Sequence, residues 1–147
     1  MPAGILMLSW LVMMQGGAAR HPTSELLGLW HGTSTCTKAD WNAACHDEEA
    51  VYDVHPGKAP GHVLLHGYKI VAGAAQFMGD LDFAYHEADD TWVAEFVGPR
   101  VTSRWVFRVT GESIEGQALH MPEKRVAREV RVTRIHGDSP WRLPPAL

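Results

Sequence analysis

Hydrophobic and polar residues alternate with a period of two in eight short segments of this chain, separated by turn residues. The clearest segment is 76–86, where one face carries apolar or small residues: Phe77, Gly79, Leu81, Phe83 and Tyr85. Such alternation is typical of strands with one buried face. The predicted strands are 29–36, 48–55, 62–71, 76–86, 91–97, 101–110, 113–119 and 126–135.

The connections between these segments are short and rich in turn formers. Glu87 to Asp90, for example, reads as a hairpin turn. Short connections favour antiparallel neighbours in sequence order, and eight strands are enough to close a sheet on itself. The pattern therefore predicts an all-β fold, an eight-stranded antiparallel up-and-down barrel.

The first nineteen residues differ from the rest because they carry no charged side chain. Ile5 to Met14 form an apolar stretch too short to span a bilayer, and Gly17 and Ala19 suit cleavage before Arg20. We expect residues 1–19 to be a signal peptide cleaved near Ala19, so that the protein is secreted or periplasmic, without an integral membrane segment in the mature chain. The alternative is a short N-terminal helix packed on the domain.

The two cysteines, Cys36 and Cys45, fit export. An even pair in an oxidising compartment forms a disulfide. Closing this loop of ten residues contributes about 2.7 kcal/mol in the chain-entropy description. The spacing is not typical of a zinc site, which also needs two further ligands.

Charge is distributed unevenly although the formal net charge is only −4. Residues 20–99 hold four Lys/Arg against twelve Asp/Glu, and residues 100–147 hold nine against five. The arginines of the last third alternate along predicted strands, where they would face acidic strands of the same sheet. We therefore expect no nucleic-acid partner. Residues 20–136 are the predicted barrel domain, and residues 137–147, with three prolines, are the predicted flexible tail.

Gly28-x-Trp30 at the start of the first strand, the meander of eight strands, and Arg134 near the end of the last strand resemble the lipocalin and calycin barrels. The surrounding sequence is similar to that of bacterial secreted lipocalin-like proteins. The resemblance implies that Trp30 packs across the closed base against Arg134. It also implies carriage of a small apolar molecule, an inference from fold-level analogy.

The strand phases indicate which side chains would line such a barrel, with Ser103 and Arg128 as polar groups able to orient a ligand. The loop 37–44 carries Trp41 and would border the mouth. The predicted ligand-binding residues are Tyr52, Leu64, Phe83, Tyr85, Trp92, Phe96, Ser103, Trp105, Phe107, Arg128 and Trp41. Small residues at Gly79, Ala94, Gly116 and Ala118 favour a cavity, whereas the many aromatics favour a filled core.

Metal and catalytic interpretations find less support. His62 and His66 share a strand face but are about 13 Å apart along it, and the acidic turns at 46–49 and 86–90 lack calcium-loop spacing. Gly32 to Cys36 does not match the nucleophile-elbow pattern. We expect no metal, no cofactor and no enzymatic activity.

The sequence therefore predicts a monomeric secreted barrel that binds a small hydrophobic or amphipathic molecule. The alternative is a filled barrel that acts through its surface, as an envelope interaction module or inhibitor.

Overall fold

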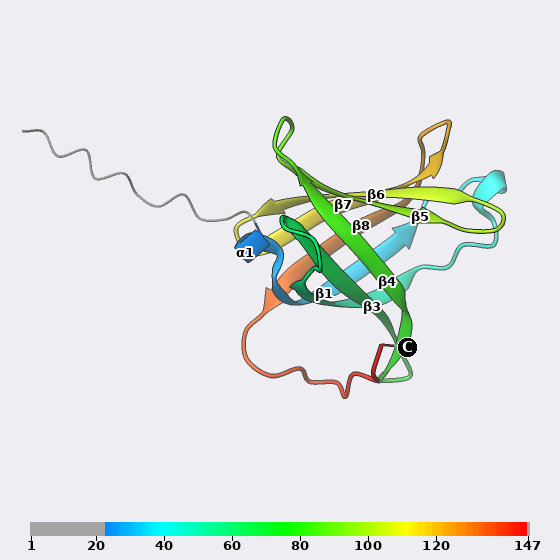
Figure 1. Ribbon diagram of the computed structural model, residues 1–147. Coiled ribbons are helices and arrows are strands. Elements are labelled where there is room, and N and C mark those ends of the chain that lie inside the picture. The colour runs from blue at the N-terminus through cyan, green and yellow to red at the C-terminus, as the bar shows by residue number, and fades with distance from the viewer. Residues whose placement is uncertain (1–22, 147) are drawn as a thin grey trace, which may run out of the picture.

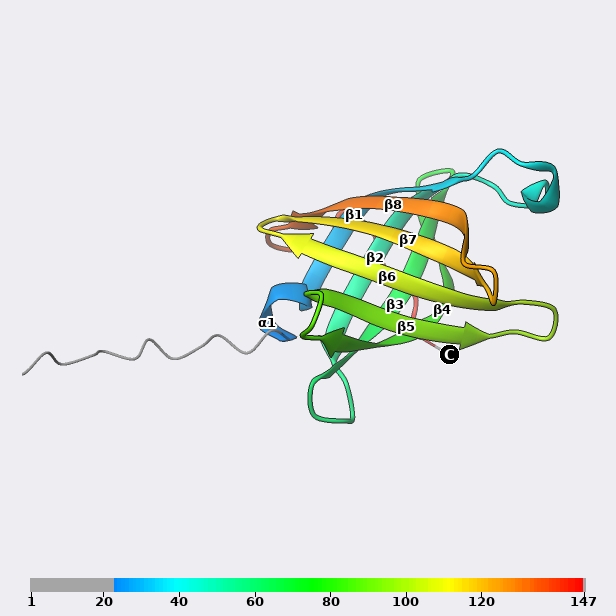
Figure 2. The same ribbon diagram turned by 90° about the horizontal axis from the view of Figure 1, so that it is seen from above.

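Eight antiparallel strands follow one another around a closed barrel in the computed structural model, which describes residues 23–146 (Figures 1 and 2). The strands are β1 (Gly28–Cys36), β2 (Glu48–Pro56), β3 (His62–Val71), β4 (Ala74–His86), β5 (Thr91–Val97), β6 (Thr102–Thr110), β7 (Ser113–Met121) and β8 (Arg125–Ile135). Within residues 23–146, helical structure is limited to α1 (Thr23–Leu26) and a 3-10 turn, η1 (Asp40–Asn42). The predicted all-β fold and up-and-down strand order are confirmed.

One end of the barrel is closed by α1 and Trp30. The Trp30 side chain is fully buried, and its indole Nε1 donates a hydrogen bond to the Leu26 carbonyl at 2.9 Å. The Arg134 guanidinium lies 4.2 Å from the centre of the Trp30 ring and donates to the carbonyls of Leu27 and Glu25. The structure thus places Trp30 and Arg134 together, as the resemblance implies.

The half of the barrel next to this closed end is filled with side chains. Phe83, Trp92 and Phe107 are buried, and the rings of Phe83 and Phe107 lie 4.7 Å apart. Gly116 leaves no room beside them, because a Cβ atom at that position would collide with the Phe107 ring. A packed interior of this kind is typical of a small barrel without an enclosed cavity at that level.

The seam between β4 and β5 is the weakest part of the sheet. Neighbouring strands elsewhere share six to ten residue pairs, whereas β4 and β5 share three, beginning at Ala84↔Val93. From there the two strands diverge toward the other end of the barrel (Figure 1). We call this opening, between residues 74–83 of β4 and residues 94–97 of β5, the open seam.

A register shift in the β3–β4 pair overturns one predicted face. Tyr68 is opposite Phe77, but Gly67 is opposite Gly79, so one extra residue of β4 is accommodated between these pairs. A bulge of this type moves the residues beyond it to the opposite face. Phe77 therefore packs outside the barrel against Tyr68, at 5.6 Å between ring centres, and does not share the inner face of Leu81.

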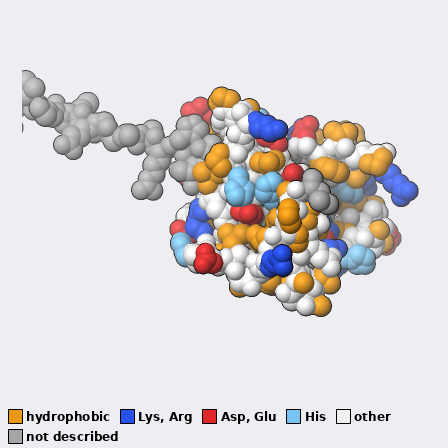
Figure 3. Space-filling model, turned by 60° about the horizontal axis from the view of Figure 1, so that its bottom comes forward, with side chains coloured by type: hydrophobic (Ala, Val, Ile, Leu, Met, Phe, Trp, Pro, Cys, Tyr) orange, Lys and Arg blue, Asp and Glu red, His pale blue; other side chains and the backbone are white. Residues whose placement is uncertain are grey.

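The C-terminal segment 136–146 is docked on the outside of the barrel, on the face seen in Figure 3. Trp141 and Leu143 pack on a small outer cluster built around Val51 and Tyr68. The Tyr68 hydroxyl donates a hydrogen bond of 2.8 Å to the Pro144 carbonyl. The sequence predicted a flexible tail, but in the structure this segment is packed on the barrel. The outer faces of β2, β3 and β4 provide the apolar surface on which it packs.

No helix within residues 23–146 has the length and apolar character needed to cross a membrane. The predicted signal peptide, residues 1–19, lies outside the described residues.

Candidate binding site

The candidate site is the end of the barrel opposite α1, which we call the open end. Four connections meet there: the loop between β1 and β2, the β3–β4 turn, the loop between β5 and β6, and the β7–β8 turn. The long loop between β1 and β2 stands out beyond the strands in Figure 2.

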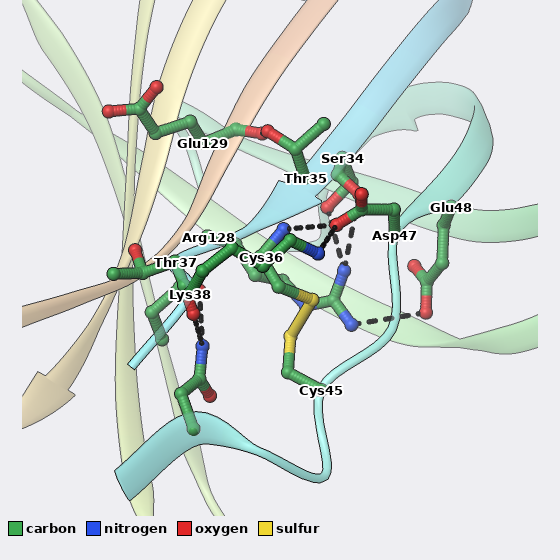
Figure 4. Close-up of a disulfide and its surroundings, with 12 residues drawn as sticks. Ser34, Thr35, Cys36, Thr37, Lys38, Cys45, Asp47, Glu48, Arg128 and Glu129 are labelled. Carbon is green, nitrogen blue, oxygen red and sulfur yellow. Dashed lines mark hydrogen bonds and ion pairs between the residues drawn. A yellow bond between two sulfur atoms is a disulfide. The ribbon is translucent and has the colours of Figure 1, made fainter. Parts of the chain in front are cut away.

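A disulfide and hydrogen bonds hold this long loop in place (Figure 4). The predicted bond between Cys36 and Cys45 is confirmed. Asp47 accepts hydrogen bonds from the Cys36 backbone N–H at 2.8 Å and from Lys38 at 3.0 Å, and these contacts lower the pKa of the Asp47 carboxyl. The Asn42 amide donates to the carbonyls of Thr37 and Ala127, which attaches the loop to β8. The loop is therefore a fixed rim.

A polar cluster lies beneath this rim, inside the barrel wall (Figure 4). The Arg128 guanidinium is 3.2 Å from Glu48 Oε1 and 3.1 Å from the hydroxyl of Ser34, which is itself buried. Tyr52 adjoins this cluster, and its pKa is raised, first by burial and then by the charge of Glu48. Only 18% of the Arg128 side chain is exposed, so its head group points into the barrel mouth and not into bulk water.

A cleft of about 550 Å³ lies at the open end, between the β5–β6 loop and the β7–β8 turn. His120 and Arg125 form one wall, and the loop 98–101 forms another. Trp41 covers these side chains: its ring is 4.4 Å from the Arg125 guanidinium and 5.0 Å from the His120 ring. Within residues 23–146, Arg125 has no carboxylate within ion-pair distance.

The open seam continues the open end down the side of the barrel. Phe96, on the inner phase of β5, is 50% exposed, and a Cβ atom built on Gly79 would meet nothing within 4 Å. Leu81 and Trp105 are half-buried and pack on the core below. The seam therefore presents apolar side chains on the side of the barrel, and the open end presents polar groups. An amphipathic molecule requires both kinds of surface.

The predicted ligand-binding residues do not form one site. Phe83, Trp92 and Phe107 lie in the filled half, with Tyr52 above them. Tyr85 is at the closed end, where its hydroxyl donates a hydrogen bond to Asp90. This hydrogen bond is the main reason that the pKa of Tyr85 is raised to about 12. The residues at the open end or its seam are Trp41, Phe96, Ser103, Trp105 and Arg128.

Leu64 lies on the outer face of β3, between His55 and Asp82 of the neighbouring strands. Its placement among the pocket residues was wrong, because Val63 and Leu65 fill the interior at this level. Both faces of β3 carry apolar residues, so alternation alone does not show which face points into the barrel. The histidines at 62 and 66, on the phase of Leu64, were the signal for the solvent side.

The prediction did not include four polar side chains that the structure places at the open end: Ser34, Glu48, His120 and Arg125. Each is adjacent to a loop or near the end of a strand, where alternation gives the least information about direction. Among residues 23–146, no three metal-ligating side chains are arranged to hold an ion.

Comparison of this chain with protein-family models, with curated protein sequences and with solved structures gave no match. The barrel is consistent with a lipocalin-like fold, and functional inference depends on the site itself.

Proposed function

We propose that this protein binds a small amphipathic molecule with an anionic head group at the open end of its barrel. The observation that carries the proposal is the open seam, which leaves Phe96 half exposed and Gly79 facing open space on the side of the barrel that leads to the open end. Paired strands close the rest of the wall, so the apolar part of a ligand has one lateral surface on which to lie.

The cleft at the open end is lined by Arg100, His120 and Arg125 with one carboxylate, Glu123, and this balance favours a negatively charged ligand. Arg125 is stacked on Trp41 and has no carboxylate partner among the described residues, so its guanidinium donors are free for an anion. A guanidinium recognises a carboxylate or a phosphate through two parallel hydrogen bonds. The cleft of about 550 Å³ is within the size range of small-molecule sites.

The filled half of the barrel limits how deep the ligand can go. Because Trp92, Phe83 and Phe107 occupy the interior toward α1, the ligand lies near the mouth and along the seam. This arrangement favours a ligand whose apolar part is a short chain or a ring.

The first experiment is native mass spectrometry of the oxidised protein purified without detergent, followed by titration with a series of medium-chain carboxylates and their alcohols. Trp41 and Trp105 provide intrinsic fluorescence at the site. We expect saturable binding of the carboxylates and weaker binding of the alcohols. A clean apo mass with no saturable binding would contradict the proposal and favour the surface-interaction alternative.

Two matched pairs of variants locate the site. Phe96→Ser should weaken binding roughly ten- to hundredfold, since a buried aromatic contact is worth about 1.5–3 kcal/mol. Val97→Ser, at its exposed neighbour, should leave affinity unchanged. Arg125→Gln should remove the preference for carboxylates, whereas Arg131→Gln, on the outer surface, should retain it. Trp41→Ala tests the rim: unchanged affinity would exclude Trp41 from the site.

A further inference from the structure

The outer face of β2, β3 and β4 carries histidines and aspartates in alternating positions, away from the open end. Across the strands, Asp53 is opposite His66 and His66 is opposite Asp80, while His55 is opposite Leu64 and Leu64 is opposite Asp82. Figure 3 shows histidine side chains next to one another on this face, with a carboxylate beside them.

His55 and His66 are diagonal neighbours in this pattern, and their ring centres are 5.3 Å apart. Two imidazoles that share one tetrahedral ion, with metal–nitrogen bonds of about 2.1 Å, have ring centres separated by roughly 5 Å. The two rings are therefore already at the separation that a shared ion requires.

A carboxylate holds each ring by one nitrogen. His66 Nδ1 is 2.5 Å from Asp80 Oδ1, and His55 Nε2 is 2.9 Å from Asp53 Oδ2. The second nitrogen of each ring, Nε2 of His66 and Nδ1 of His55, has no hydrogen-bond partner in the described part of the chain. Metal-ligating histidines commonly have this arrangement, in which a carboxylate orients the ring and increases its basicity.

We propose that His55 and His66 bind one divalent transition-metal ion on the outer face of the barrel, with Asp80 as the positioning residue behind His66. Two imidazoles suit Cu²⁺, Ni²⁺ and Zn²⁺, and the usual order of stability places Cu²⁺ first. Water completes the coordination.

The test is titration of the full oxidised chain with Cu²⁺ and Zn²⁺ by calorimetry, together with electron paramagnetic resonance of the Cu²⁺ form. We expect one site with two coordinated imidazole nitrogens. His55→Gln and His66→Gln should each weaken binding at this site at least tenfold and reduce the nitrogen count to one.

His62→Gln is the matched control. It is on the same strand and face as His66 and is also paired with an aspartate, Asp82, at 2.7 Å, but it is not the histidine stacked on His55. The His62→Gln variant should bind the metal ion as tightly as the parent protein. Equal losses in the three variants, or no loss in His55→Gln and His66→Gln, would overturn the proposal and assign the binding to other histidines.

Asp80→Asn tests the positioning role. The variant should bind the ion about tenfold more weakly, while the unfolding midpoint of the metal-free protein stays within error of that of Asp82→Asn. If both asparagine variants bind equally well, Asp80 has no part in the site. Neither result depends on a ligand in the barrel.

Discussion

Arg134 shows how one side chain can join three elements. Its guanidinium covers the Trp30 ring at 4.2 Å, donates to the carbonyls of Leu27 and Glu25, and lies 3.4 Å from Glu112 in the β6–β7 turn. Hydrogen bonds from a charged donor are worth about 1.5–3 kcal/mol each, and a half-buried cation–π contact is worth about 1–2 kcal/mol. Two of these contacts end at backbone carbonyls in or next to α1.

We therefore expect Arg134→Met to lower the free energy of unfolding by about 3 kcal/mol, measured by urea denaturation followed by tryptophan fluorescence. Arg131→Met is the control, because Arg131 is in the same strand with its side chain 72% exposed and only a distant ion pair to Glu115. Its effect should stay within about 0.5 kcal/mol. Similar losses of unfolding free energy in both variants would show that the contacts of Arg134 with Trp30 and the nearby carbonyls do not contribute specifically to stability.

At the scale of elements, the C-terminal segment acts as a strap on the outside of the barrel. Without it, the outer faces of Val51, Tyr68 and Ala75 would be open to water, although all three are buried. Trp141 supplies the largest apolar contact and also lies 4.7 Å from the His31 ring. The strap thus gives the β1–β4 side of the barrel a second small core.

Trp141→Ala should reduce the free energy of unfolding by about 1–2 kcal/mol, because it exposes this second core. Arg142→Ala, one residue further along with an exposed side chain, should have no measurable effect. Chemical denaturation of both variants provides the measurement. If Trp141→Ala is as stable as the parent protein, the strap does not contribute to the fold.

At the scale of the whole molecule, the barrel has two halves of different character. The half at α1 is filled and fully paired, while the half at the open end contains charged and small residues and a wall that is parted along one seam. Local stability follows the density of buried contacts and of backbone pairing. The open half should therefore fluctuate more than the closed half.

Hydrogen exchange resolves this difference. Seam-facing amides of β4 within residues 76–83 and of β5 within residues 94–97 should exchange much faster than amides in β7 and β8, which share eight residue pairs. A ligand bound in the seam should slow the first group. Uniform protection of all eight strands would contradict a parted wall.

The sequence predicted that arginines of the last third would face acidic residues of the same sheet, and two arginines of β6 and β8 do so. Arg104 bonds to Glu95 of β5, and Arg131 lies 3.6 Å from Glu115 of β7. These two arginines are thus paired with glutamates of the neighbouring strands. Alternation was sufficient here because both partners belong to strands whose faces were clear.

Local periodicity determined much of this protein. Period-two alternation and turn residues predicted the eight strands and their order, since both signals depend on near neighbours in the chain. The even number of cysteines, together with the expected export, predicted the bond between Cys36 and Cys45.

Tertiary structure decided the rest, because it depends on pairings between residues distant in sequence. The bulge opposite Gly67 moved Phe77 outside, and the packing of Val63 and Leu65 left Leu64 on the surface. Gly79 and Gly116 look alike in sequence, yet the first faces open space and the second lies against Phe107. Whether a small residue leaves a cavity depends on the side chain across the barrel, which no local pattern contains.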